Sequence, residues 1–271
     1  MWWKRISEKS FDQAVELYIA EHPDFSFKKF LGYGSYGRTY LIEDCSSASL
    51  FVLKCLRPKH RHHQKTIHKF QQEIHILQQL SLPYVPTIHS AGTILDSPFF
   101  IMDYVNGQTF EQLIFQNGAK FTIAQSLAIT KQLLEQIVQL HNYGIVHRDL
   151  RIPNILLVGQ QLHIIDFGLA TTYQKLIDIS TIENPKRAEN HISDLYFVGH
   201  FLLFLLYSDY KPSKKKEKAW QQELKLPIEV QDFLERLLWI QEPFASALEA
   251  LQSMPPSIDK TIKNRIVHRQ T

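Results

Sequence analysis

The sequence predicts an α+β fold in two lobes, a smaller strand-rich lobe and a larger helical lobe joined by a short hinge. Between residues 25 and 105, the sequence contains short runs rich in β-branched and aromatic residues, which are typical of strands. After the turn signal Asn106-Gly107, apolar residues recur every three or four positions, as in helices. The 271 residues, 44% of them hydrophobic, can bury a substantial core, which argues against a disordered chain.

Residues 1–25 are expected to form a helical extension that precedes the strand-rich lobe. Four apolar residues follow one another at helical spacing in this segment: Phe11, Val15, Tyr18 and Ile19. Ser10 stands just before them and is the predicted N-cap, because serine hydroxyls accept hydrogen bonds from the free N–H groups of a helix start.

The strand-rich lobe is expected to cover residues 26–105. Strands are predicted around residues 29–31, 39–42 and 50–53, and one helix is predicted at 67–80. The helical lobe is expected to cover residues 106–257. Its predicted helices lie at residues 122–141, 194–207 and 228–239, and residues 258–271 form a basic C-terminal tail.

Composition limits the classes of protein to which the chain can belong. Two cysteines are too few for a disulfide framework, and no secretory signal opens the sequence. The longest apolar run, Phe197 to Tyr207, is shorter than the roughly 20 residues that span a bilayer. A net charge of +3 gives no argument for nucleic acid. We therefore expect a cytoplasmic protein with no transmembrane segment and no specific nucleic-acid partner.

A glycine-rich run from Gly32 to Gly37 lies between two predicted strands. Because Gly32, Gly34 and Gly37 lack side chains, the backbone can approach phosphate oxygens closely and point N–H groups at them. A dinucleotide-binding loop would lead into a helix, whereas here Arg38 and Thr39 begin another strand. The run favours a flap over a phosphate group, and a simple glycine-rich hairpin is the alternative.

A lysine inside an apolar strand is the second candidate. Lys54 lies within the run from Leu50 to Leu56, where a buried ammonium requires an anion. Glu73 is the only acid in the predicted helix at 67–80 and is the candidate partner. A phosphate would serve equally, and a lysine that extends from a sheet edge to solvent is the alternative.

Two further polar clusters carry oxygen ligands. Asp149 and Asn154 lie five residues apart in a loop between apolar runs, and Asp166 ends the apolar strand that follows. Carboxylate and amide oxygens of this kind are ligands for Mg²⁺, and one acid remains to accept a hydroxyl proton.

Over roughly residues 26–257, these motifs in this order resemble protein kinases of the eukaryotic type, and in particular the compact serine/threonine kinases of bacteria. The resemblance implies a bilobal fold with a small antiparallel sheet, and ATP and Mg²⁺ as cofactors. Lys54 and Glu73 would then form an ion pair beside the nucleotide, and Asp149 would orient and deprotonate the acceptor hydroxyl. Asn154 and Asp166 would hold the metal.

The resemblance also implies where the nucleotide would lie. Residues 99–105 match the hinge whose backbone contacts adenine, and Met102 matches the gatekeeper. Asp194 matches the buried acid that anchors the catalytic loop. The expected nucleotide contacts are Gly32, Gly34, Gly37, Thr39, Lys54, Met102, Asp103, Val105 and Leu156.

Several positions depart from the family pattern. Arg151 replaces the usual lysine, and we expect it to keep a phosphate contact in the catalytic set with a forked geometry. No Ala-Pro-Glu motif closes the segment after Gly168, and Phe244 stands where the arginine partner of that glutamate is expected. Loss of both partners can be neutral when apolar packing replaces them. Arg148 is a candidate receptor for a phosphate group on this segment.

We therefore expect an ATP-dependent protein kinase that phosphorylates serine or threonine, its own residues included. A small-molecule or lipid kinase on the same fold is the first alternative, because the altered segment after Gly168 leaves the acceptor open. A nucleotide-binding scaffold without turnover is the second.

Overall fold

The computed structural model describes residues 7–173, 179–211 and 218–256, so the predicted basic tail lies outside the described residues. The chain folds as two compact units. The first comprises Met1–Gly107 and Leu156–Thr171, and the second comprises Gln108–Ile155 and Thr172–Thr271. The residues from 156 to 171 thus cluster with the first unit although they follow part of the second in sequence. The lobe boundaries given above stay a prediction.

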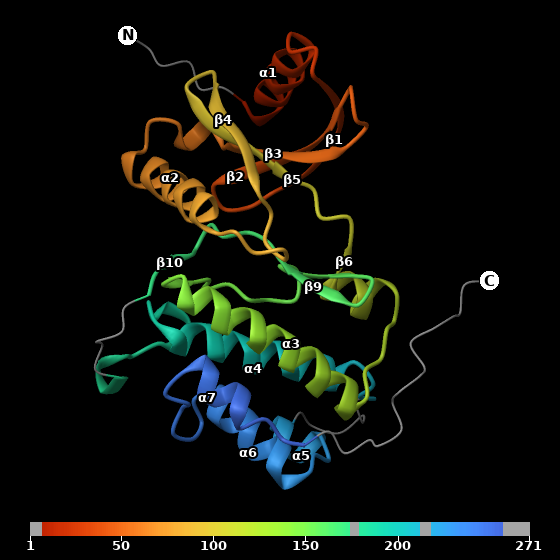
Figure 1. Cartoon of the computed structure of the whole chain (residues 1–271), viewed down its shortest axis with the longest axis vertical. Coiled ribbons are helices and arrows are strands. Elements are labelled where there is room, and N and C mark those ends of the chain that lie inside the picture. Colours follow the sequence, from red (N-terminus) through yellow and green to blue (C-terminus); the bar gives the residue numbers. More distant parts are fainter. Residues whose placement is uncertain (1–6, 174–178, 212–217, 257–271) are drawn as a thin grey trace, which may run out of the picture. The chain divides into compact units, whose positions relative to one another are not determined.

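A five-stranded antiparallel sheet forms the centre of the first unit (Figure 1). Its spatial order is β1-β2-β3-β5-β4. The strands are β1 Phe25–Tyr33, β2 Gly37–Asp44, β3 Leu50–Leu56, β4 Ile88–Ile94 and β5 Ser97–Asp103. The sheet confirms the predicted α+β class and its small antiparallel sheet.

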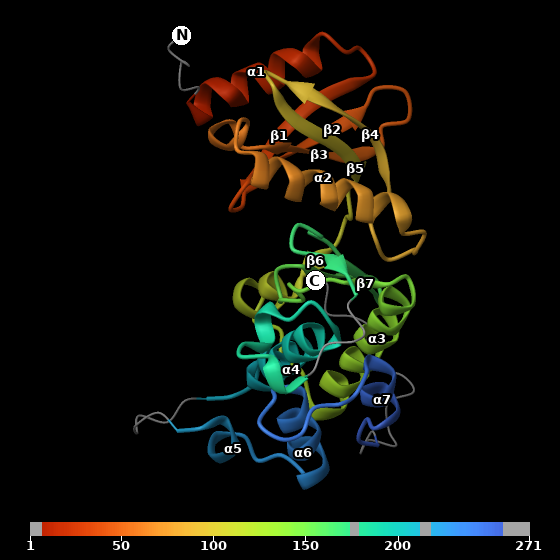
Figure 2. The same cartoon turned by 90° about the vertical axis from the view of Figure 1, so that its left-hand side faces the viewer.

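Two helices, α1 (Glu8–Ala20) and α2 (Gln64–Gln79), cover opposite faces of this sheet (Figure 2). Strand residues alternate between the faces, so neighbours in β3 point to different helices. Leu53 and Cys55 belong to the core cluster under α1. Lys54 points the other way and bonds to Glu73 of α2. The alternation explains how one lysine in an apolar strand reaches a polar partner.

The start of α1 corrects one expectation. Its N-cap is Ser7 and not Ser10, and the Ser7 hydroxyl accepts a hydrogen bond from the Ser10 N–H at 3.0 Å. The helix is held on the sheet by Phe11, Val15 and Ile19, each at most 3% exposed. The apolar spacing was therefore a better guide to the buried face than to the first residue.

The remainder of the first unit is built from short elements. A 3-10 turn, η1 (Pro58–His60), follows β3, and the strands β8 (Ile155–Val158) and β9 (Gln161–Ile164) lie side by side. The Ile164 N–H donates to the Tyr84 carbonyl at 2.9 Å, which joins the end of β9 to the segment before β4.

The second unit is mainly helical. The long helices α3 (Ile123–Asn142) and α4 (His191–Tyr207) lie side by side, with α7 (Ala247–Gln252) against α3 and α6 (Ile228–Leu237) against α4 (Figure 1). The short elements are β6 Gln108–Thr109, the π-helix η2 Gln112–Gln116, β7 Ile145–Val146, β10 Thr171–Thr172, η3 Ile179–Thr181, η4 Pro185–Arg187 and α5 Trp220–Glu223.

The helix boundaries follow capping chemistry. Thr122 caps α3 in a capping box with Gln125, so this helix begins within one residue of its predicted start. Helix α4 begins at His191, three residues before the predicted start, because the Asn190 side chain accepts the Ile192 N–H at 3.1 Å. Within the residues that the structure describes, none of the helices has the length and apolar character needed to cross a membrane.

Candidate active site

The glycine-rich run forms the hairpin between β1 and β2, as the strand-turn-strand pattern predicted. The Thr39 hydroxyl donates to the Gly32 carbonyl at 3.1 Å, and the Gly34 N–H donates to the Gly37 carbonyl at 2.9 Å. Gly32 has a φ of 153°, which disfavours other residues. At Gly37 a Cβ atom would lie 3.0 Å from the Lys54 Cε atom. A glycine there lets the hairpin lie directly over the lysine.

Lys54 is the centre of the first polar cluster. Its Nζ atom donates to Glu73 Oε1 at 2.6 Å and to Asp166 Oδ1 at 2.8 Å. Burial alone would lower the pKa of Lys54, but the Asp166 and Glu73 carboxylates outweigh it and raise this pKa above its usual value. These contacts therefore favour the charged form of the Lys54 ammonium.

The two carboxylates differ in environment. The side chain of Glu73 is 1% exposed and that of Asp166 is 49% exposed. Burial raises the pKa of Glu73, while the attraction of Lys54 opposes that rise. Asp166 has a φ of 62°, a left-handed conformation that is costly for this residue and is common at functional sites. Glu73 is thus suited to holding the lysine, and Asp166 to meeting a ligand.

A contact between Tyr36 and Gly168 was not anticipated from the sequence. The Tyr36 hydroxyl, at the tip of the glycine-rich hairpin, donates to the Gly168 carbonyl. A Cβ atom at Gly168 would lie 1.9 Å from this hydroxyl, so any other residue would displace the Tyr36 side chain. The two residues are 132 positions apart, and no local pattern relates them.

The predicted hinge residues lie at the end of β5 and just beyond it. Met102 is buried and Val105 is half-buried. The Asp103 carboxylate accepts the Thr87 N–H at 2.9 Å and lies 2.6 Å from His89 Nε2. Partial burial opposes ionisation, but these hydrogen bonds lower the pKa of Asp103. The Asp103 N–H also donates to the Thr87 carbonyl at 3.0 Å, so both the side chain and the N–H of this residue are engaged within the first unit. Leu156, in β8, is buried.

The second polar cluster lies in the second unit, around Asp149. The Arg151 guanidinium grips this carboxylate as a fork, with Nε 2.5 Å from Oδ1 and Nη2 3.0 Å from Oδ2. The Asn154 Nδ2 donates to Asp149 Oδ2 at 2.8 Å and to the Asp149 carbonyl at 2.9 Å. Asp149 is thus fixed from two sides. The amide nitrogen of Asn154 is turned toward Asp149, so the amide oxygen of Asn154 points away from Asp149.

Asp194, in the first turn of α4, holds the backbone of the loop that carries Asp149. Its two carboxylate oxygens accept the His147 N–H at 3.0 Å and the Arg148 N–H at 2.7 Å, and His141 Nε2 lies 3.0 Å away. Complete burial opposes ionisation, yet these donors lower the pKa of Asp194. Arg148 has a φ of 65°, a strained conformation that the two hydrogen bonds can maintain.

The segment after Gly168 supplies partners for Arg148. The Arg148 guanidinium lies 3.2 Å from Glu189 Oε1 and donates to the Arg187 carbonyl at 3.1 Å. The predicted apolar substitution at Phe244 is also evident, since this ring is 1% exposed, packs on Phe233 at 5.3 Å and lies beneath the Arg236 guanidinium. Phe244 therefore packs against an aromatic ring on one side and the Arg236 guanidinium on the other, and this arginine pairs with Glu249 at 2.8 Å.

The candidate metal ligands suit Mg²⁺ by their chemistry. Asp166 offers a half-exposed carboxylate and Asn154 an amide oxygen, both hard ligands. Among the described residues, no group of three or more His, Cys, Asp or Glu side chains could hold a metal by itself. Mg²⁺ usually binds through one or two protein oxygens together with phosphates and water.

Comparisons with known proteins agree with this geometry. The family model described as "Protein kinase domain" matches residues 25–188. The probable serine/threonine-protein kinase YbdM of Bacillus subtilis is 35% identical over 89% of this chain and 92% of its own length. The serine/threonine-protein kinase PrkC of the same organism is 27% identical, and the probable kinase PknB of Lactococcus lactis is 28% identical. This chain covers 30% of the length of each of these two.

Proposed function

The chain belongs to the protein kinase family, and we propose that it transfers the γ-phosphate of Mg-ATP to a serine or threonine hydroxyl of a protein substrate. The observation that carries this proposal is the cluster of Lys54 with Glu73 and Asp166. A buried ammonium, held by one buried carboxylate and one exposed carboxylate, is a group built to meet a phosphate and its metal.

We assign the parts of the reaction to these residues. Lys54 binds phosphate oxygens, and Glu73 keeps the ammonium in place. Asp166 and Asn154 would each offer an oxygen ligand to Mg²⁺, which would neutralise charge on the phosphates. The backbone of the glycine-rich hairpin covers the phosphates with its N–H groups.

Asp149 accepts the proton of the acceptor hydroxyl. A general base must be oriented before the reaction, and the fork of Arg151 and the amide of Asn154 fix the Asp149 carboxylate in position. The partners that we propose are therefore ATP and a protein substrate, which includes the chain itself. Neither the relatives above nor these contacts favour a lipid or small-molecule kinase, or a scaffold without turnover.

The test is transfer of label from γ-labelled ATP with Mg²⁺ to generic protein substrates by the purified chain. We expect transfer by the wild type and loss of at least 100-fold in the rate with Asp149→Asn, a typical range for a general base. Asp209→Asn, in an exposed ion pair with Lys120, is the matched control and should keep the wild-type rate. Equal rates for Asp149→Asn and the wild type would refute the assignment.

A further inference from the structure

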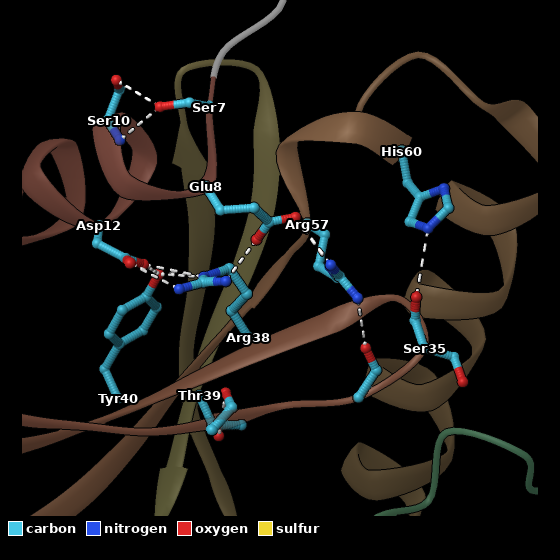
Figure 3. A network of polar contacts seen from close by, with 12 residues as sticks. Ser7, Glu8, Ser10, Asp12, Ser35, Arg38, Thr39, Tyr40, Arg57 and His60 are labelled. Carbon is cyan, nitrogen blue, oxygen red and sulfur yellow. Dashed lines mark hydrogen bonds and ion pairs between the residues drawn. The ribbon is translucent and has the colours of Figure 1, made fainter.

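A network of ion pairs joins the N-terminal helix α1 to the edge of the glycine-rich hairpin (Figure 3). Asp12 of α1 grips the Arg38 guanidinium, with distances of 2.9 Å from Nε to Oδ1 and 2.6 Å from Nη2 to Oδ2. Glu8, one turn earlier, contacts Arg38 and also accepts from Arg57 Nε at 3.0 Å. Two carboxylates of one helix thus hold two arginines, Arg38 at the start of β2 and Arg57 directly after β3.

Arg38 is the residue directly after the last glycine of the hairpin. It is only 5% exposed, its guanidinium lies 4.5 Å from the centre of the Phe30 ring, and it also donates to the Tyr40 hydroxyl at 3.2 Å. A buried guanidinium needs charged partners, and both of its carboxylate partners come from α1. The charge of the Arg38 side chain is therefore balanced by the helix.

Arg57 reaches the hairpin itself. Its Nη1 donates to the Gly34 carbonyl at 3.0 Å, its backbone N–H donates to the Tyr36 carbonyl at 2.7 Å, and its guanidinium lies 4.9 Å from the centre of the Tyr33 ring. Three residues of the hairpin thus meet one arginine, and the side chain of that arginine is fixed by Glu8 (Figure 3).

The apolar contacts of α1 are separate from these ion pairs. The helix packs on the sheet through its fully buried apolar side chains, chiefly Phe11 and Val15. Glu8 and Asp12 are half-buried and lie in the first half of α1, where their carboxylates contact the two arginines. Substitution of these acids therefore removes the ion pairs and leaves the apolar contacts of the helix in place.

We propose that α1 positions the glycine-rich hairpin for nucleotide binding, with Glu8 acting through Arg57 and Asp12 through Arg38. Both acids are positioning residues, since neither belongs to the hairpin. The expected effect on ATP binding rests on the proposed function. The contact between α1 and the hairpin does not depend on that function. It extends the nucleotide site beyond the family motifs to a helix that precedes the matched family model.

The test compares Glu8→Gln, Asp12→Asn and their combination with the wild type in the full chain. Glu16→Gln is the matched control, because Glu16 is an exposed acid of the same helix. Three quantities are measured: the KM for ATP against kcat, the Kd of a non-hydrolysable ATP analogue, and amide hydrogen exchange of residues 33–37 without nucleotide.

We expect the double variant to weaken ATP binding about fivefold, the lower end of typical coupling between two sites, with kcat nearly unchanged. Amide exchange of the hairpin should become faster, and Glu16→Gln should match the wild type in all three measurements. Arg57→Lys keeps the charge but loses the fork, and should give part of the effect.

A double variant with a lower Tm but an unchanged Kd, KM and hairpin exchange would overturn the proposal, because the network would then serve stability alone. If the wild type bound no nucleotide, the proposed function would fail. The hairpin exchange would still decide whether α1 holds the hairpin, so the two failures are distinguishable.

Discussion

At the scale of single residues, the site follows from the cost of burying charge. An ammonium within an apolar strand must have an anion nearby, which allowed the sequence to relate Lys54 to the one acid of the following helix. The structure brings these two groups to 2.6 Å. The contact of Lys54 with Asp166 was not expected, because the residues are 112 positions apart and come together only through folding.

Replacement of Glu73 by glutamine tests the charge of this cluster, because it removes the carboxylate charge and keeps the size of the side chain. Glu73→Gln keeps the volume of a side chain that is 1% exposed, but it leaves Lys54 with Asp166 as its carboxylate partner. The ammonium then shifts toward Asp166, and we expect kcat/KM to fall about 100-fold, as for other prepositioned polar groups. Steady-state kinetics measure this, with Glu16→Gln as the control. Unchanged kcat/KM would show that the ion pair has no part in catalysis.

Arg151 makes a contact that the sequence did not predict. Its guanidinium forks onto Asp149, with distances of 2.5 and 3.0 Å, while the phosphate contact implied by the resemblance stays a prediction. Local spacing could not reveal this, because the choice between a phosphate and a neighbouring carboxylate depends on side-chain conformation.

Arg151→Lys should therefore lower kcat and leave the KM for ATP nearly unchanged. A lysine offers a single charged point and cannot hold both carboxylate oxygens, so Asp149 becomes less well oriented. We expect about a tenfold fall in kcat from this loss of orientation. An increase in the KM for ATP with a normal kcat would instead support direct contact with phosphate.

At the scale of elements, capping rules and apolar spacing were informative to different degrees. The start of α3 was predicted to within one residue, since the predicted helix began at Thr122 and the structure has this residue as the N-cap, in a complete capping box with Gln125. The start of α1 was misplaced because Ser7 and Ser10 both fit the rule, and only the hydrogen bond between them identifies the cap. Elements of three to five residues, such as η4 and α5, are too short to give a periodic pattern.

The capping box at α3 gives a prediction about stability. Thr122→Ala should lower the free energy of unfolding by about 1 kcal/mol, because the Gln125 N–H loses its acceptor. Thermal unfolding should show a Tm about 2–4 °C lower, as expected for a chain of this size. Thr122→Ser keeps the hydroxyl and should behave as the wild type. Equal losses in the two variants would mean that the methyl group, and not the cap, is important.

At the scale of the whole molecule, a buried histidine of the helical unit is expected to make the free energy of unfolding depend on pH. His191, at the start of α4, lies 2.9 Å from the Tyr173 hydroxyl. Burial, reinforced by the nearby His141, lowers the pKa of His191 from 6.5 to about 4. Between these pH values the unfolded chain binds more protons than the folded chain, so acidification favours unfolding.

We therefore expect the free energy of unfolding to fall as the pH drops from 6.5 to 4, by at most about 3 kcal/mol from this group. His191→Gln removes the titrating group and should flatten the dependence measured by denaturant unfolding at several pH values. His75→Gln changes an exposed histidine and should keep the wild-type slope. A slope unaffected by His191→Gln would contradict this assignment.

The family and the two-lobed organisation could be predicted at this scale because several motifs occur in a fixed order along the chain. The loss of both partners of the family's ion pair stays a prediction; in the structure Phe244 is buried between Phe233 and the Arg236 guanidinium. The contact of Arg148 with Glu189 could not be predicted, since the spacing of this segment differs from the family pattern.

The central claim is transfer of phosphate from ATP to a serine or threonine of a protein. Phosphoamino-acid analysis after incubation with γ-labelled ATP and Mg²⁺ tests it most directly. We predict phosphoserine or phosphothreonine in the chain or in an added protein, and none with Asp166→Ala, which removes a metal ligand and a partner of Lys54. Wild-type protein that binds ATP but yields neither phosphoamino acid, on itself or on any added protein, would contradict the claim.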